Sequence, residues 1–219
     1  IAQNQQINSN NMATTEEKED ALNQVEAHKQ AAIATINQAQ STQQVSEAKN
    51  NGINTINQDQ PNAVKKNNTK TILEQKGNEK KSAIAQTPDA TTEEKQEAVS
   101  AVSQAVANGI THINQANSND DVDQELSNAE QIITHTNVNV QKKPQARQAL
   151  IAKTNEKQSA INSDNEGTIE EKQKAIQSLN DAKNLADEQI TQAASNQNVD
   201  NALNIGISNI SKIQTNFTK

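Results

Sequence analysis

Apolar residues along this chain recur every three or four positions, the spacing that keeps side chains on one face of an α-helix. Between residues 99 and 113 they are Val99, Val102, Val106, Gly109 and Ile113. No segment of the sequence sustains the apolar–polar alternation of a β-strand. We therefore predict an all-α fold. The predicted helices span 14–39, 42–57 and 65–86, and the same pattern predicts equivalent helices at 91–116, 119–134, 142–163, 168–193 and 196–211.

The recurrence reflects an internal repeat. ATTEEK occupies residues 13–18 and 90–95, and the related GTIEEK occupies 167–172, so the three copies begin at a constant interval. Self-similarity at a fixed interval is the signature of a tandem repeat array. We predict the end of a preceding repeat at 1–13, complete three-helix repeats at 14–90 and 91–167, and an incomplete third repeat with its first two helices at 168–219.

The first helix of each repeat begins with a Thr-x-x-Glu pattern, which predicts a capping box. In this motif the threonine hydroxyl and the glutamate carboxylate accept hydrogen bonds from backbone N–H groups that have no partner inside the helix. The predicted caps are Thr14 with Glu17, Thr91 with Glu94, and Thr168 with Glu171. Serine is a good N-cap residue, and the second helix of each copy is predicted to start near Ser41, Ser118 and Ser195.

An apolar seam predicts which residues of the first two helices are buried. Its members are Val25, Ile36, Val45 and Ile56 in the first copy, Val102, Ile113, Val122 and Ile133 in the second, and Leu179, Ile190, Val199 and Ile210 in the third. Gly52, Ala129 and Gly206 share one position in the second helix, and a small residue there predicts a close approach of two helices.

The third helix is predicted to bury adjacent apolar pairs. They are Ile72 with Leu73, Ala83 with Ile84, Ala149 with Leu150, and Ala160 with Ile161. Three antiparallel helices with these small side chains predict an up-down-up bundle with a thin core. An odd number of helices puts the entry and exit of the chain at opposite ends of the bundle. Short linkers would then arrange the bundles into an elongated rod.

Composition excludes several classes of function. The net charge is −7 at pH 7, which argues against nucleic-acid binding because a phosphate backbone requires a concentrated basic surface. The chain has no Trp, Tyr or Cys, and Phe217 is its only aromatic residue, so we exclude stacking platforms, disulfides and thiolate metal sites. No signal peptide or membrane-spanning run is present. Because the chain opens on Ile1 in mid-pattern, we interpret it as a fragment whose targeting signals lie outside it.

Candidate catalytic and metal-binding residues fail a test that the repeats themselves provide: a site required by every copy should recur at the repeat interval. The histidines His28, His112 and His135 align with other residue types in the remaining copies. An acidic cluster at Asp120, Asp121, Asp123 and Glu125 lacks the glycine and spacing of a calcium loop, and acids are favoured at a helix N-terminus in any case. We expect no catalytic, metal-binding or cofactor-binding residues, and no enzyme activity.

The order of these motifs resembles a known family. A-T-x-E-E-K is followed by I-N-Q-A, a V-x-x-A-x-x-x-G-x-x-x-I segment, a proline break and a lysine-rich third segment. The whole chain resembles the repeat of unknown function in staphylococcal cell-wall-anchored surface proteins of the FmtB, SasC and Ebh types. The resemblance implies an extracellular protein attached to peptidoglycan, with repeats forming a stalk linked to adhesion, aggregation and biofilm formation. It supplies no catalytic or ligand-binding residues. Copy two departs from the pattern at Glu125 and Ala129.

Three functions remain open at this point. The repeats are a spacer that projects an adhesive region, a module that binds a host matrix or plasma protein such as fibronectin or albumin, or a surface for self-association between cells. The positions alike in all copies are the seam and the caps, whereas exposed positions vary. This distribution favours the spacer, because a binding module would keep an exposed patch. We expect neither nucleic-acid binding nor membrane insertion.

Overall fold

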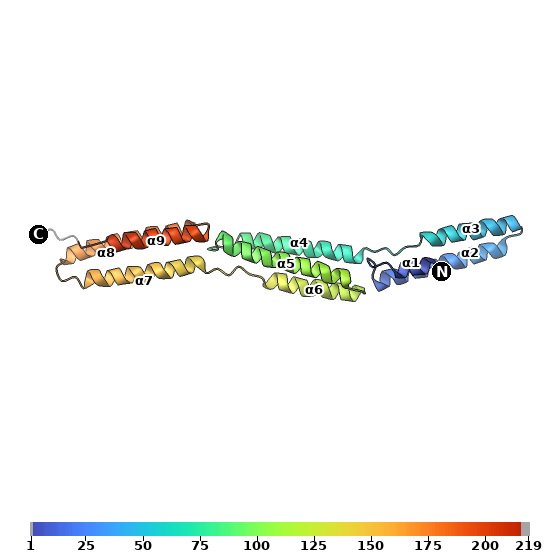
Figure 1. Ribbon diagram of the computed structural model, residues 1–219, viewed down its shortest axis with the longest axis horizontal. Helices are drawn as coiled ribbons and strands as arrows, with labels where there is room; N and C mark the ends of the chain where they lie inside the picture. The colour runs from blue at the N-terminus through green and yellow to red at the C-terminus, as the bar shows by residue number, and fades with distance from the viewer. Residues whose placement is uncertain (1, 216–219) are drawn as a thin grey trace. The chain divides into compact units, whose positions relative to one another are not determined.

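The computed structural model describes residues 2–215, and every regular element among them is an α-helix. The helices are α1 (Ala2–Asn8), α2 (Thr15–Gln38), α3 (Thr42–Gln58), α4 (Lys65–Ala85), α5 (Thr92–Gln115), α6 (Asn119–His135), α7 (Lys142–Asn162), α8 (Ile169–Gln192) and α9 (Asn196–Lys212). The predicted all-α array of three-helix bundles is confirmed (Figure 1). Ile1 and Phe217 lie outside the described residues.

Helices pack in successive groups of three. In the last group α7, α8 and α9 each contact the other two, and in the first group α2 contacts both α1 and α3. Two compact units are distinguished in the chain, residues 1–80 with 102–135 and residues 81–101 with 136–219. The first unit holds α1–α3, α6 and the larger part of α4, and the second holds α7–α9.

The packing group differs in phase from the predicted sequence repeat. Repeats counted from the ATTEEK motif place the helices at 65–85 and 142–162 third in their copy. In the structure, however, Leu73 and Gly77 of α4 pack against α5, Lys80 of α4 donates to a carbonyl of α6, and α7 packs with α8 and α9. Each bundle therefore combines the third helix of one sequence repeat with the first two helices of the next. The boundaries at 14, 91 and 168 remain a prediction about the repeat in the sequence, because a periodic chain can be divided at any phase.

The second helix of each copy starts at a capped serine. The hydroxyl of Ser41 accepts a hydrogen bond from the N–H of Gln44 at 3.2 Å, and Ser195 accepts one from Asn198 at 3.2 Å. Ser118 accepts in the same way from Asp121 at 3.1 Å. Each hydroxyl satisfies an N–H in the first turn that has no carbonyl partner within its helix.

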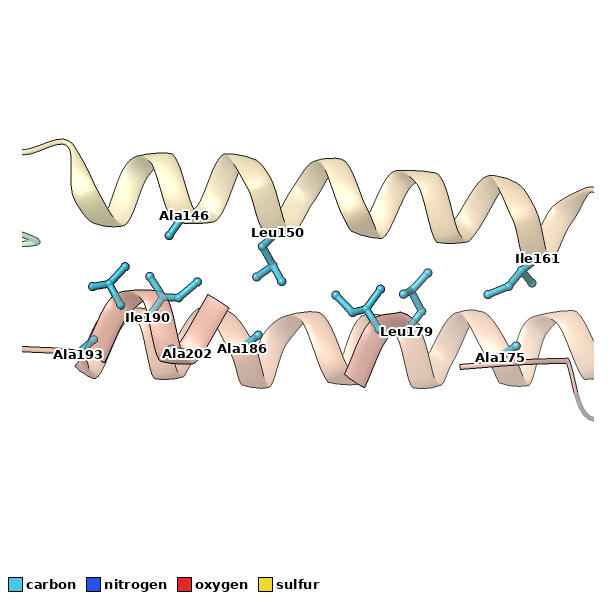
Figure 2. Packing of buried hydrophobic residues seen from close by; sticks show 11 residues of the cluster. Ala146, Leu150, Ile161, Ala175, Leu179, Ala186, Ile190, Ala193 and Ala202 are labelled. Carbon is cyan, nitrogen blue, oxygen red and sulfur yellow. The ribbon is translucent and has the colours of Figure 1, made fainter. Parts of the chain in front are cut away.

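Small aliphatic side chains form the core of each bundle. In the last bundle Ala146, Leu150 and Ile161 of α7 point toward the buried residues of α8, among them Leu179 and Ile190 (Figure 2). Val199, Ala202 and Ile210 of α9 belong to the same cluster. Alanine side chains bury little area, so this core depends on close helix approach.

Two predicted faces differ in detail from the structure. In α5 the fully buried stripe passes through Ala98, Val102, Ala105 and Ile113, while Val99 and Val106 are half-buried. The third helix buries one member of each predicted pair, namely Leu73, Ile84, Leu150 and Ile161, and exposes Ile72, Ala83, Ala149 and Ala160. Its inward face also carries Lys66 and Thr69. Helical spacing selected these positions over their apolar neighbours, because adjacent residues point about 100° apart.

The seam is less buried in the first copy than in the others. Val45 is 39% exposed, whereas Val122 and Val199 are 0% exposed. Ile36 and Ile56 are half-buried, whereas their counterparts in the other copies have 3% exposure or less. The reason is the length of the helix that packs against the first two helices of each copy. In this bundle that helix is α1, with 7 residues, whereas α4 and α7 have 21 each.

A glycine faces an alanine where the first two helices of each sequence copy cross, and the helix that carries the glycine differs between copies. A Cβ added to Gly52 or Gly206 would lie 2.4 Å or 2.5 Å from the Cβ of Ala32 or Ala186. In the second copy the glycine lies on the other helix, and a Cβ on Gly109 would be 2.7 Å from the Cβ of Ala129. The two helices therefore approach so closely that only one of the paired positions carries a side chain.

We predict that Gly109→Ala destabilises the bundle of α4–α6 by about 1–3 kcal/mol through overpacking, and that Gly109→Ala with Ala129→Gly recovers most of this loss. Hydrogen exchange of α5 and α6 amides measures the effect without assuming that the whole chain unfolds in one step. Ala107→Gly at an exposed site of α5 is the matched control for helix propensity, which differs by about 1 kcal/mol between these residues. Unchanged protection in Gly109→Ala would contradict the close approach.

Candidate functional site

The predicted capping residues lie at a junction between consecutive bundles, and this junction occurs twice. The first junction comprises the start of α2 at 14–17, the start of α4 at 64–66 and the start of α6 at 117–123. The second comprises the corresponding segments of α5, α7 and α9, at 91–94, 141–143 and 194–200. Each joins a helix of one bundle to two helices of the next.

One glutamate carboxylate caps two helices at each junction. In the first, Oε2 of Glu17 accepts from the N–H of Thr14 at 2.9 Å, as expected of a capping box. Its Oε1 accepts from the N–H groups of Val64 and Lys65, at 2.9 Å and 2.8 Å, where α4 begins. Three backbone N–H groups from two bundles thus share one carboxylate.

The second junction repeats this arrangement with the same atoms. Oε2 of Glu94 accepts from the N–H of Thr91 at 2.8 Å, and Oε1 accepts from the N–H groups of Gln141 and Lys142, both at 2.8 Å. Val64 and Gln141 share a position, yet their side chains have nothing in common. The bond uses only their backbone, so side-chain variation at this position does not disturb it.

A second set of hydrogen bonds connects the threonines to the start of the second helix. The hydroxyl of Thr14 donates to Oδ1 of Asn119 at 2.9 Å, and Thr91 donates to Asn196 at 2.7 Å. In return, the N–H of Asn119 donates to Oε2 of Glu16 at 2.9 Å. Both threonines are 0% exposed, so these bonds are shielded from water.

The backbone also bridges the junction. The N–H of Thr15 donates to the carbonyl of Asn117 at 2.8 Å, and the N–H of Thr92 donates to the carbonyl of Ala194 at 2.8 Å. The hydroxyl of each threonine donates to the same carbonyl, at 3.1 Å and 3.0 Å.

A buried lysine at each junction donates hydrogen bonds to backbone carbonyls. Nζ of Lys66 donates to the carbonyls of Asn11 and Asn114 at 3.1 Å and 3.0 Å, and Nζ of Lys143 donates to the carbonyl of Thr191 at 2.7 Å. Asn114 and Thr191 lie in the last turns of α5 and α8, where carbonyls lack helical partners and a cation is favoured. Burial, together with the charge of Lys18, lowers the pKa of Lys66.

A neighbouring lysine contributes an exposed ion pair. Nζ of Lys65 lies 2.6 Å from Oδ1 of Asp123, and Nζ of Lys142 lies 2.7 Å from Oδ1 of Asp200. Pairs of this kind contribute little because water screens them.

The second junction has an additional ion-pair network. The guanidinium of Arg147, the only arginine of the chain, donates to both carboxylate oxygens of Asp89 at 2.9 Å and 3.2 Å. Its Nε donates to Oδ1 of Asp187 at 3.0 Å. The hydrogen bond from Arg147 holds the pKa of Asp89 below its usual value, despite some burial. The backbone of Asp89 has a φ of 58°, a left-handed turn that aspartate tolerates better than most residues.

The two bridging carboxylates are held in the ionised form. Burial opposes ionisation of Glu17 and Glu94, but the backbone N–H groups outweigh it and keep the pKa of both below the usual 4.5. A carboxylate with a lowered pKa in the folded state stabilises that state above its unfolded pKa. This contribution is lost as the pH falls through the folded pKa.

The structure brings the predicted caps together with residues that the sequence analysis missed. Thr14, Glu17, Thr91 and Glu94 lie in the junctions, and Thr168 and Glu171 form a capping box at the start of α8. The predicted seam residues are buried inside the bundles, except that Ile36 and Ile56 are half-buried and Val45 is exposed. The missed residues are Lys66, Lys143, Asn119 and Asn196. Lys66 and Lys143 are one repeat interval apart, as are Asn119 and Asn196, although the first copy has Thr42 at the asparagine position. Recurrence in two copies is the signal that could have identified them.

The histidines and the acidic cluster have local partners. Nδ1 of His28 lies 2.9 Å from both carboxylate oxygens of Asp59, and that of His112 lies 3.4 Å from Glu125. Asp121 accepts from the N–H of Ser118 at the start of α6. Within residues 2–215 no group of three or more His, Cys, Asp or Glu is placed to hold a metal ion. Over the same range, none of the helices has the length and apolar character needed to span a membrane.

We predict that Glu94→Gln destabilises the second junction by about 1–2 kcal/mol, because the amide loses the charge and one strong acceptor. Protection of the Thr91, Gln141 and Lys142 amides from hydrogen exchange should fall about ten-fold or more at pH 7. As the pH is lowered below 4.5, the difference between wild type and variant should shrink, since the wild-type carboxyl becomes protonated. Glu97→Gln, on an exposed position of α5, is the control. A difference that persists at pH 2–3 would contradict the role of the charge.

Comparison with known proteins places the chain in a family. A family model described as a domain of unknown function, DUF1542, matches residues 1–64, 65–141 and 142–218. The second and third matches begin at the first residues of α4 and α7, so each match covers one three-helix bundle. The chain is 30% identical over 206 residues to the extracellular matrix-binding protein ebh of Staphylococcus aureus strain MRSA252, over 94% of this chain and 2% of ebh. No solved structure matches it. The predicted resemblance is thus confirmed, and the chain belongs to the DUF1542 family, of whose domain it carries three copies.

Proposed function

We propose that this chain is a non-enzymatic spacer segment of an extracellular, cell-wall-anchored staphylococcal surface protein. Its bundles hold a distal adhesive region away from the wall and so support adhesion or biofilm formation. The observation that carries the proposal is the recurrent junction. Glu17 and Glu94 bind the same positions of the following bundle through the same atoms.

A spacer needs a fixed connection between consecutive bundles, and the junction supplies one. The linkers between the second and third helices are short, at 59–64 and 136–141. Their ends are bound by the carboxylate of the preceding bundle, and their following lysines are buried or half-buried. Freely jointed bundles would have exposed linkers without such bonds. Because the bonds use backbone groups and recurring side chains, further copies extend the array without new contacts.

A second candidate function is binding of a host matrix or plasma protein. It is favoured by the name of the relative, an extracellular matrix-binding protein. The surface grooves argue against a ligand shared by all copies. A groove of about 630 Å³ between α5 and α6 is lined by His112 and Glu125, whereas the corresponding groove of about 360 Å³ between α2 and α3 presents Thr35 and Ala48. Binding by a single copy remains compatible with this difference.

We predict that small-angle X-ray scattering of the monomeric chain gives a radius of gyration near 33 Å, as expected for bundles about 39 Å long placed end to end over about 110 Å. A compact globule of this length would have about 17 Å. Replacing Thr14, Glu17, Thr91 and Glu94 together by Ala or Gln should reduce the value, because the junctions would become flexible. A radius as small as that of the globule, measured for the unaltered chain, would contradict the spacer function.

We also predict that the chain shows no saturable binding, at micromolar concentrations, to immobilised fibronectin, fibrinogen, collagen or albumin. Surface plasmon resonance against each protein tests this directly. A reference surface without immobilised protein controls for nonspecific adsorption. Saturable micromolar binding that His112→Ala with Glu125→Ala abolishes would identify the α5–α6 groove as a ligand site, and matrix binding would replace the spacer as the leading function.

A further inference from the structure

Each junction has a contact that attaches the turn before its capped helix to the following bundle, and the two junctions make this contact differently. In the first junction the turn precedes α2, and Nζ of Lys66 donates to the carbonyl of Asn11 within it at 3.1 Å. Lys66 belongs to α4 and is 3% exposed. This attachment therefore joins a buried ammonium group to a neutral backbone carbonyl.

The second junction makes the attachment through two charged side chains in contact with solvent. Pro88 occupies the position of Asn11, and the acceptor in the turn is the side chain of the next residue, Asp89. Both of its carboxylate oxygens accept from the guanidinium of Arg147 in α7, at 2.9 Å and 3.2 Å. The side chain of Asp89 is 44% exposed and that of Arg147 is 26% exposed.

The first junction lacks the residues for such a pair. Met12 and Lys70 stand at the positions of Asp89 and Arg147. The turns also differ in backbone conformation, because Asp89 has a φ of 58° and Met12 does not have a positive φ. The attachment of the turn is thus kept in both junctions, although the residues that make it have changed.

Arg147 is held in position by the last bundle. Its Nε donates to Oδ1 of Asp187 at 3.0 Å, and a terminal nitrogen donates to Oγ1 of Thr191 at 2.9 Å, both residues of α8. A bidentate arginine–carboxylate pair within a network contributes more than an isolated exposed pair. The pair with Asp89 therefore stabilises the junction at low ionic strength, while water and dissolved ions still reach it.

Dissolved salt distinguishes the two attachments. Exposed charges are screened over a Debye length of about 10 Å at 0.1 M salt and about 3 Å at 1 M, whereas buried groups are screened much less. Salt therefore weakens the Asp89–Arg147 pair and changes the buried contact of Lys66 little. Both junctions also have one exposed lysine pair, made by Lys65 or Lys142. That shared contribution cancels when the junctions are compared.

We propose that the second junction is a salt-sensitive joint of the array, in which Asp89 and Arg147 form a clasp that opens as the ionic strength rises. The clasp attaches the turn between α4 and α5 to α7 and α8. When it opens, Glu94 still accepts from the backbone at the start of α7, so the joint becomes more flexible without separating. Increased flexibility of a spacer at this one point rests on the function proposed above, whereas the opening of the clasp does not.

Hydrogen exchange of the full chain in NaCl at about 0.05 M and at about 1 M tests the clasp. The reporter amides are Thr92 at the second junction and Thr15 at the first, which donate to the carbonyls of Ala194 and Asn117. Between low and high salt, protection of Thr92 should fall about three- to ten-fold more than that of Thr15. Equal salt dependence of the two amides would overturn the proposal.

Asp89→Asn isolates the clasp, because asparagine tolerates the left-handed backbone and carries no charge. At low salt its Thr92 amide should be about three- to ten-fold less protected than in the wild type, and salt should then affect Thr92 and Thr15 equally. Arg147→Gln should have at least the same effect. The double variant should differ little from Arg147→Gln, as expected of two partners in one contact.

Lys153→Gln is the matched control, because it removes an exposed pair with Glu156 that lies within α7 and does not reach the turn. It should leave the protection of Thr92 and its salt dependence unchanged. An excess salt dependence of Thr92 that persists in both Asp89→Asn and Arg147→Gln would show that other charges cause it, and the clasp would be rejected. The scattering result expected of a spacer at one fixed ionic strength is unaffected by either outcome, so the two proposals fail separately.

Discussion

The structure depends on a carboxylate that satisfies backbone groups of two helices at once. Every helix starts with N–H groups that lack partners, and two helices that start at one junction present twice as many. Glu17 and Glu94 accept hydrogen bonds from backbone N–H groups at the start of their own helix. They also accept from the start of α4 or α7, the helix that begins the next bundle. Folding of one bundle thus positions the acceptor that the next bundle needs. A junction made only of exposed ion pairs would be weakened by salt and contribute little.

Thin cores impose the second constraint. Without large side chains, a bundle gains packing energy only by bringing backbones close, and the glycine–alanine crossing achieves this in all three copies. The exchange of positions between Gly109 and Ala129 shows that the separation of the helices matters, not the identity of either residue. In the second and last bundles a leucine, Leu73 or Leu150, lies at this crossing.

The sequence predicted the helices because apolar spacing and capping boxes are local signals. Helix α2 starts one residue after the predicted cap Thr14, and α3 starts after Ser41. The inward face of the third helix was harder to predict. Its buried positions include Lys66 and Thr69. A prediction based on apolar residues omits these two and selects the exposed Ile72 instead. The burial of Lys66 is caused by carbonyls in other helices, which no local pattern reveals.

Only the capping half of the junction could be predicted from the sequence. Thr14 and Glu17 are recognisable as a cap, but the second pair of N–H groups on the same carboxylate belongs to residues 47 and 48 positions away. Their side chains carry no signal, because the contact is made by the backbone. The sequence does show recurrence. Asn119 and Asn196 occupy the same position of the repeat, as do Lys66 and Lys143, although the residues around them differ. Recurrence of polar residues indicates contacts between copies, as recurrence of apolar residues indicates the core.

The junction explains how these bundles form an array. Each bundle consists of three consecutive helices and corresponds to one family match, so contacts between copies are made at the junctions. Stability in such arrays combines the contribution of each unit with that of its interface to the neighbour. Here that interface includes the junction, where a carboxylate of one bundle accepts from the backbone at the start of the next. Within a bundle, burial of the seam depends on the length of the helix that covers it: Val122 and Val199 are fully buried where this helix has 21 residues, and Val45 is 39% exposed where it has 7.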